Sequence, residues 1–130
     1  MSIRVGIDLI SVESVRASVD THADHYLERI YTRDEVEDCR TGGTIDASRL
    51  AARFAAKEAT IKVLRPERDE AVPWSSIGVR RDPSGATGLE LTGHAAELAA
   101  GAGLTDLAVS LTHENDLAAA VVVARTETRG

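Results

Sequence analysis

The first residues of the chain alternate between two faces. One face is aliphatic and carries Ile3, Val5, Ile7 and Leu9. The other face carries Arg4, Gly6, Asp8 and Ile10. A repeat of two residues is the period of a β-strand. The sequence therefore predicts an N-terminal strand that is at least half buried and contains one acidic residue, Asp8.

Two helical regions are predicted after this strand. The first is rich in acidic residues and reaches about Arg40, where a pair of glycines closes it. The second begins near Asp46 or Ser48 and runs to about Leu64, because Pro66 cannot continue a helix. This second region is long enough to span one side of a small domain.

The large apolar side chains of the second helix form one stripe when residues are placed 100° apart. The stripe consists of Leu50, Phe54, Ile61 and Leu64. We expect this stripe to face the sheet. Lys57 falls inside it, whereas Glu58 and Lys62 lie on a flank beside the small residues Ala51 and Ala55.

The second half of the chain predicts two hairpins with a helix between them. Strands at 74–81 and 87–91 are joined by the turn-forming residues 82–85, and a short helix over 92–103 ends at glycines. A second hairpin follows, with its turn near 113–116. This order of elements predicts an α+β fold in which a mainly antiparallel sheet packs against the long helix.

Composition places limits on the function. The chain has 130 residues, 43% of them hydrophobic, and no repeat or linker, so we expect a single domain over residues 1–130. A net charge of −6 and few aromatic residues argue against nucleic-acid binding. The lone Cys39 cannot form an internal disulfide, and no leader or long apolar run is visible. We therefore expect a cytoplasmic protein that does not bind a membrane.

Charge is unevenly distributed along the chain. Residues 12–40 carry eight acidic side chains against four basic ones. Residues 49–68 reverse this ratio, with six basic side chains against two acidic ones. A solvated helix face is the ordinary explanation for such a run. A site for a polyanion is the alternative.

Asp8 and Glu58 favour the polyanion site. A carboxylate in an apolar strand costs several kcal/mol unless it is paired, hydrogen-bonded or bound to a metal. Asp8 on the strand and Glu58 on the helix packed over it would offer two oxygen ligands to Mg²⁺, which prefers such ligands and retains several waters. The ordinary alternative is an exposed Glu58–Lys62 pair, worth only a few tenths of a kcal/mol. With the metal, Arg53, Lys57 and Lys62 become counter-charges for a polyphosphate.

The stretch SLTHE, residues 110–114, ends a predicted strand with hydroxyl groups and the imidazole of His113. By itself this pattern is weak, because a histidine at a strand end is more often a surface residue than a ligand.

Three segments together resemble one known family. GIDLISV near the start, LAARFAAKEATIKVL in the middle and VSLTHENDLAAAVVVA near the end are similar to the holo-acyl-carrier-protein synthases, the small type of 4′-phosphopantetheinyl transferase. The resemblance extends from Val5 to Ala124, and RFAAKEA is its most specific block. The order and spacing of the three blocks are more specific than any one of them.

The resemblance implies an enzyme that moves the phosphopantetheine arm of coenzyme A to a serine of apo acyl carrier protein. It implies a requirement for Mg²⁺, bound by Asp8 and Glu58, and release of adenosine 3′,5′-bisphosphate. It also implies a homotrimer with active sites between subunits. The family residues that contact coenzyme A phosphates correspond here to Arg53, Lys57, Lys62 and His113. Asp8, Glu58 and Lys62 are then the expected catalytic residues.

Two departures from the family pattern affect these expectations. Relatives generally have a glycine-rich turn after the long helix, whereas residues 65–73 contain no glycine. Many relatives have a basic residue, used to dock an acidic carrier, at the position of Ser14. Docking of an acidic carrier here would require a basic patch formed by Arg16, Arg29 or Arg33.

Two other functions fit parts of the sequence. A non-catalytic subunit that binds coenzyme A, or packs into a larger synthase, would account for the missing glycines. A small Mg²⁺-dependent nucleotide hydrolase could use the same two carboxylates, but the chain has no Walker-type glycine loop.

Overall fold

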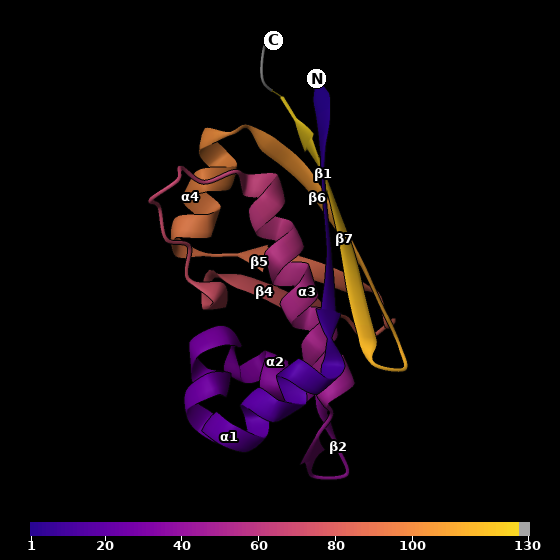
Figure 1. Cartoon of the computed structure of the whole chain (residues 1–130). Coiled ribbons are helices and arrows are strands. Elements are labelled where there is room, and N and C mark those ends of the chain that lie inside the picture. Colours follow the sequence, from indigo (N-terminus) through magenta and orange to yellow (C-terminus); the bar gives the residue numbers. More distant parts are fainter. Residues whose placement is uncertain (128–130) are drawn as a thin grey trace.

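The computed structural model describes residues 1–127. The helix α3, Ala47–Leu64, lies at its centre and is covered on one side by the strands β1, Ser2–Ser11, β7, Leu117–Thr126, and β6, Leu104–Glu114 (Figure 1). The two chain ends of the described part lie close together at one end of the molecule. The expected α+β arrangement of an antiparallel sheet on one long helix is confirmed.

The three long strands form one antiparallel sheet in the order β1-β7-β6. The strands β1 and β6 are therefore its two edges. Asp8 lies on β1 opposite Ala120 of β7, and His113 lies on β6 opposite Ala118 of β7. The topology thus places these two candidate residues at opposite edges of the sheet.

The aliphatic face of β1 points away from α3. Its side chains are largely exposed: Ile3 67%, Val5 60%, Ile7 64% and Leu9 62%. The other face, with Gly6 and Asp8, meets α3. A Cβ atom at Gly6 would overlap the carbonyl oxygen of Ala59, so the strand and the helix approach more closely than any residue with a side chain would permit.

The face of α3 that meets the sheet also differs from the expectation. Its small residues pack on β7, with Ala59 and Val63 against Val122 and Ala124. The predicted stripe of large side chains points instead into the rest of the domain, where the ring of Phe54 lies across that of Trp74 at 5.3 Å. The expectation was wrong because short side chains, not bulky ones, permit the close approach of helix and sheet at Gly6.

The acidic segment predicted after β1 forms two helices. The helix α1, Val12–Ile30, is interrupted at Ala23, whose φ is +46°. The helix α2, Arg33–Asp38, begins with a capping box in which Thr32 and Glu35 bond to each other's backbone N–H. The short strands β2, Arg40–Thr41, and β3, Thr44–Ile45, then lead to α3.

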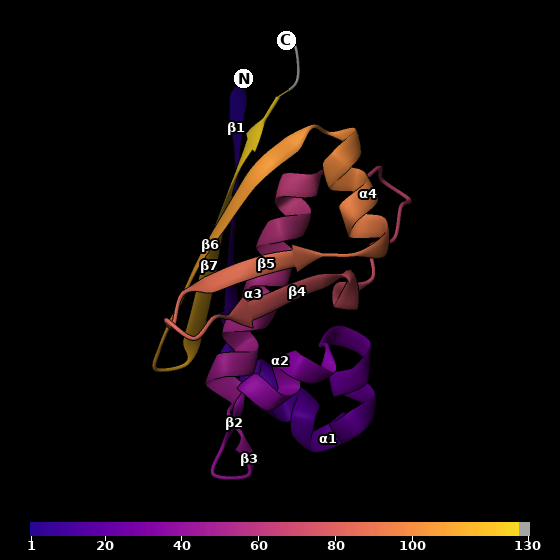
Figure 2. The ribbon, with the colours of Figure 1, turned by 180° about the vertical axis from the view of Figure 1, so that it is seen from behind.

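The remaining elements cover the side of α3 away from the large sheet (Figure 2). They are the 3-10 turn η1, Trp74–Ser76, the hairpin of β4, Ile77–Arg81, and β5, Thr87–Leu91, and the helix α4, Gly93–Gly101. Both predicted hairpins and the helix between them are confirmed, except that residues 74–76, predicted as strand, form η1, so β4 begins only at Ile77. Within residues 1–127, no helix is long and apolar enough to cross a membrane.

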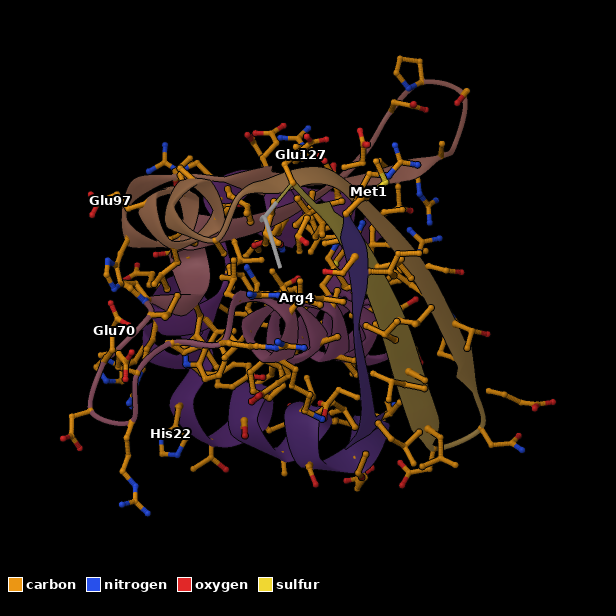
Figure 3. All side chains as sticks on the ribbon, turned by 90° about the horizontal axis from the view of Figure 1, so that it is seen from above. Met1, Arg4, His22, Glu70, Glu97 and Glu127 are labelled. Atoms are coloured by element: carbon orange, nitrogen blue, oxygen red, sulfur yellow. The ribbon has the colours of Figure 1, made fainter. Side chains whose placement is uncertain are left out.

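Figure 3 looks along α3 from the end at which the chain termini lie. The large sheet is on one side of the helix and α4, which carries Glu97, is on the other. Arg4 of β1 reaches over the end of α3, where its guanidinium donates to the carbonyl oxygen of Val63 at 2.9 Å. Contacts of this kind join β1 to the helix on both sides of Gly6.

Candidate functional site

Lys62 and Asp8 form the first contact of the candidate site. The Lys62 ammonium donates to the carbonyl oxygen of Ile7 at 2.7 Å and to Oδ1 of Asp8 at 3.1 Å. The contact exists because Gly6 lets α3 lie directly on β1. The Lys62 side chain remains 53% exposed, so its ammonium is open to a ligand.

Glu58 lies one helical turn before Lys62 and is partly buried. Burial raises the pKa of its carboxyl group, the negative charge of Asp8 raises that pKa further, and Lys62 opposes both effects. Glu58 and Asp8 therefore both lie near Lys62, Asp8 through its contact with the ammonium and Glu58 one turn away on α3. Two carboxylates beside a single exposed ammonium leave an excess of negative charge there.

The two carboxylates fit a hard divalent cation that keeps most of its water. Within residues 1–127, no group of three or more histidine, cysteine, aspartate or glutamate side chains could hold a metal ion. Mg²⁺ commonly binds through one or two carboxylates together with waters and substrate phosphate oxygens, and Asp8 and Glu58 supply such a donor set.

A second group of candidate residues surrounds a cavity of about 430 Å³ beside β6. Its basic lining residues are Arg49, Arg53, Arg81 and His113. Arg53 is only 3% exposed, and within the described residues its side chain makes one hydrogen bond, a long one of 3.4 Å to the carbonyl oxygen of Arg49. Within residues 1–127 its buried Nε atom has no hydrogen-bond partner. Arg49 forms an ion pair with Asp46 at 3.7 Å, but the three arginines still concentrate positive charge around the cavity, which is suited to a phosphate group.

The two groups do not meet within one chain. Asp8 lies on the β1 edge of the sheet, whereas His113 lies on the β6 edge with β7 between them. Arg53 and Glu58 are five residues apart on α3, which separates their directions by about 140°. The central helix and the sheet therefore stand between the carboxylate pair and the basic cavity.

The surroundings of Lys57 contradict the prediction that this residue binds a phosphate. Its side chain is completely buried, and its ammonium donates to Oε1 of Glu35 at 2.8 Å and to the carbonyl oxygens of Trp74 and Ile77. Burial lowers the pKa of Lys57, and the Glu35 carboxylate opposes this shift. All three ammonium protons thus have protein acceptors, so none is available to a phosphate.

Sequence reasoning missed three residues. Arg49 and Arg81 line the basic cavity, but they are far apart in the sequence and no local pattern joins them to His113. Glu35 is buried and pairs with Lys57. The spacing of Thr32 and Glu35 is that of a capping box, which could have identified the helix start but not the partner of the carboxylate.

The three arginines considered for a carrier-docking patch have different surroundings. Arg16 is paired with Glu13 at 2.7 Å. Arg33 lines a cavity that also contains acidic side chains, among them Asp24, Glu28 and Glu37. Arg29 lines a cavity of about 580 Å³ whose other residues are His22, His25, Tyr26, Ile30 and Trp74. Among the described lining residues, this last cavity contains no carboxylate.

Comparison with known proteins gives consistent matches over nearly the whole chain. The family model described as the 4′-phosphopantetheinyl transferase superfamily matches residues 4–122. A holo-[acyl-carrier-protein] synthase of Chloroflexus aurantiacus is 40% identical over 131 residues, which cover 92% of this chain and 95% of that protein.

Solved structures agree with these sequence matches. The coenzyme A complex of ACPS from Chronobacterium ammoniagenes has a TM-score of 0.83 at 27% identity, covering 98% of this chain and 100% of that chain. The acyl carrier protein synthase of Mycobacterium tuberculosis has a TM-score of 0.72 at 39% identity, covering 94% of this chain and 96% of that chain. The chain therefore belongs to the holo-[acyl-carrier-protein] synthases, enzymes of the 4′-phosphopantetheinyl transferase superfamily.

Proposed function

We propose that the protein transfers the 4′-phosphopantetheine arm of coenzyme A to a serine of apo acyl carrier protein, in a Mg²⁺-dependent reaction that releases adenosine 3′,5′-bisphosphate. The observation that supports this most directly is the contact of Lys62 with Asp8, with Glu58 one turn away on the same helix. The similar protein from Chronobacterium ammoniagenes forms a complex with coenzyme A, which is the donor that the proposal requires.

The bonds that change are at the β-phosphorus of the coenzyme A pyrophosphate. The serine oxygen forms a new bond to this phosphorus, and the bond from the phosphorus to the bridging oxygen breaks. Adenosine 3′,5′-bisphosphate leaves with the electron pair of that bond. The Lys62 ammonium is exposed enough to lie against the bridging oxygen and stabilise the negative charge that develops there.

Asp8 and Glu58 are the proposed metal ligands. When bound, Mg²⁺ supplies a positive charge that holds the pyrophosphate oxygens and neutralises the charge developing on them. Glu58 is also the proposed acceptor of the serine proton, through an intervening water.

The basic cavity is the proposed site for the remaining phosphate of coenzyme A, the 3′-phosphate. Arg53 and His113 are the residues that the family resemblance indicates, and Arg49 and Arg81 extend the same positive lining. The support for this assignment is the buried guanidinium of Arg53, whose Nε atom has no partner within residues 1–127. An anionic ligand would supply the missing acceptor.

A homotrimer would bring the two groups together. Each chain carries the carboxylate pair at the β1 edge and the basic cavity at the β6 edge, so neighbouring chains can each contribute one half of a site. The aliphatic face of β1 supports this assembly, because its four large side chains are exposed in the single chain and would be buried against neighbours.

The carrier protein is proposed to dock at the cavity beside α1. Its lining combines Arg29, His22 and His25 with the apolar surfaces of Tyr26 and Trp74. An acidic recognition helix is complementary to this lining and less so to the cavity of Arg33, where three carboxylates accompany Arg33 and Arg40. The cytoplasm is the proposed location on the strength of the family resemblance.

The direct test follows the mass of the acceptor. The protein would be incubated with coenzyme A, Mg²⁺ and apo carrier proteins of fatty acid, polyketide and peptide synthases, with and without EDTA. The proposal requires a gain of one phosphopantetheine arm that EDTA abolishes and excess Mg²⁺ restores. The preferred acceptor would identify the pathway. A folded protein that modifies none of the carriers would refute the proposal.

A further inference from the structure

The ion pair between Lys57 and Glu35 is completely buried. Both side chains have no exposed surface, and the Nζ and Oε1 atoms lie 2.8 Å apart. A buried ion pair is weak evidence of stabilisation, because removing two charges from water costs about as much as their attraction returns. Its presence beside the basic cavity therefore calls for another explanation.

The pair binds main-chain atoms of three segments. Lys57 of α3 donates to the carbonyl oxygens of Trp74 and Ile77, which lie in η1 and at the start of β4. Glu35 of α2 accepts from the backbone N–H of Thr32 at 2.8 Å and from that of Val79 at 2.9 Å. Every polar atom of the pair has a partner, and the partners fix the main chain of β4 relative to α3.

The elements joined by the pair are those that carry two arginines of the cavity. Arg53 lies one turn before Lys57 on α3, so both side chains leave the helix in the same direction. Arg81 lies two residues after Val79 on β4 and lines the same cavity. The distance between these two guanidinium groups therefore depends on how β4 is held against α3.

We propose that Lys57 and Glu35 are positioning residues for the phosphate-binding cavity. Neither lines the cavity nor is exposed to a ligand. They act by holding β4 against α3 at the spacing that lets Arg53 and Arg81 bind one anion together. An apolar pair of the same size could fill the volume but could not bind the backbone N–H and carbonyl groups, so it would leave the strand free to shift.

Glu35→Gln is the most conservative test. The amide keeps the shape of the side chain, but its nitrogen cannot accept a hydrogen bond, so at least one of the bonds from Thr32, Lys57 or Val79 is lost. Isothermal titration with adenosine 3′,5′-bisphosphate would measure anion binding directly. Because small displacements of a positioned group have large effects, we expect about 10-fold weaker binding and an equal rise in KM for coenzyme A. The KM for the apo carrier should not change.

Leu27→Ala is the matched control. Leu27 is a buried residue of α1 that does not line the basic cavity, so this variant should lower stability while the bonds from Lys57 and Glu35 to β4 remain. It should bind adenosine 3′,5′-bisphosphate as the wild type does. Equal weakening in Leu27→Ala and Glu35→Gln would mean that lower stability alone is responsible, and would overturn the proposal.

The proposal rests on the assignment of the cavity to coenzyme A, and the two can fail separately. If the wild type does not bind the bisphosphate, or Arg81→Gln does not weaken its binding, the assignment of the cavity to coenzyme A is wrong. The positioning role of Lys57 and Glu35 is then wrong as well. If Arg81→Gln weakens binding but Glu35→Gln binds like the wild type, only the positioning role is wrong.

A second variant covers the case in which Glu35→Gln does not fold. The double change Lys57→Met with Glu35→Leu removes both charges and keeps the volume, a replacement that other proteins have tolerated. The proposal predicts a folded protein with the same loss of about 10-fold in affinity for the bisphosphate. Wild-type affinity in this folded double variant would refute the positioning role.

Discussion

The Nζ atom of Lys62 lies 3.1 Å from Oδ1 of Asp8. This contact joins the central helix to an edge strand and places an ammonium group beside two carboxylates, because Glu58 lies one turn away. The close approach depends on Gly6, over which the backbone of Ala59 lies directly. The chemistry proposed for the protein therefore depends on the packing of one glycine.

Asp8→Asn should abolish most of the activity without unfolding the protein. The amide preserves the shape but removes one of the two charges that would hold the metal. We expect at least about a 100-fold fall in kcat/KM, the scale on which single electrostatic contributors act. The far-ultraviolet circular dichroism should match that of the wild type. Glu28→Gln, a change on the exposed face of α1, is the control and should leave kcat/KM unchanged.

The raised pKa of Glu58 predicts a pH dependence of activity. Its carboxyl group takes up a proton at a pH above the ordinary glutamate value of 4.5, and the protonated form binds a metal poorly. The acid limb of the kcat/KM profile should therefore lie above this value, and a higher Mg²⁺ concentration should move it to lower pH. An acid limb that does not respond to Mg²⁺ would argue against Glu58 as a ligand.

The same shift predicts a gain in stability for Glu58→Gln without metal. A carboxyl group whose pKa is higher in the folded state favours folding while it is protonated, and this contribution is lost as the pH rises through that pKa. At neutral pH the glutamine variant should therefore have the higher melting temperature. The difference should vanish at acidic pH, where Glu58 of the wild type is neutral. Differential scanning calorimetry in EDTA across this pH range is the measurement.

Gly6→Ala tests the packing on which the site depends. The added methyl group would overlap the carbonyl oxygen of Ala59, so β1 and α3 must separate. Overpacking of this kind costs about 1–3 kcal/mol, measurable by urea denaturation, and separates Lys62 from Asp8. Gly88→Ala is the control, because nothing lies within 4 Å of a Cβ atom there. Full activity in a stable Gly6→Ala protein would contradict the account.

Arg29→Gln tests the proposed carrier surface. Removing the one permanent positive charge of this cavity should raise KM for the apo carrier about 5-fold to 10-fold, leave KM for coenzyme A unchanged and make the reaction less sensitive to salt. Arg33→Gln makes the same change in net charge on the neighbouring cavity, and should have little effect. A similar rise in both variants would indicate a general electrostatic effect with no defined docking surface.

How far the sequence predicted this site depended on what each residue contacts. The sequence could predict that Asp8 and Glu58 act together, because an acidic residue in an apolar strand indicates a polar site even before its partner is known. Which face of β1 meets α3 could not be predicted. Aliphatic and polar residues alternate in the same way whether the aliphatic face packs on a helix or on another subunit. Lys57 was misassigned because its acceptors, Glu35, Trp74 and Ile77, are 17 to 22 residues away in the sequence.

The central claim is that each site is shared between two chains, and complementation tests it most directly. Asp8→Asn and Arg53→Gln would each be expressed alone, and then together with different affinity tags so that mixed assemblies can be purified. Each variant alone should be nearly inactive. In each purified mixed trimer, one of the three interfaces would combine an intact Asp8 from one chain with an intact Arg53 from its neighbour. The account therefore predicts that about a third of the wild-type transferase activity returns. Mixed trimers that contain both variants but show no more activity than either variant alone would contradict it.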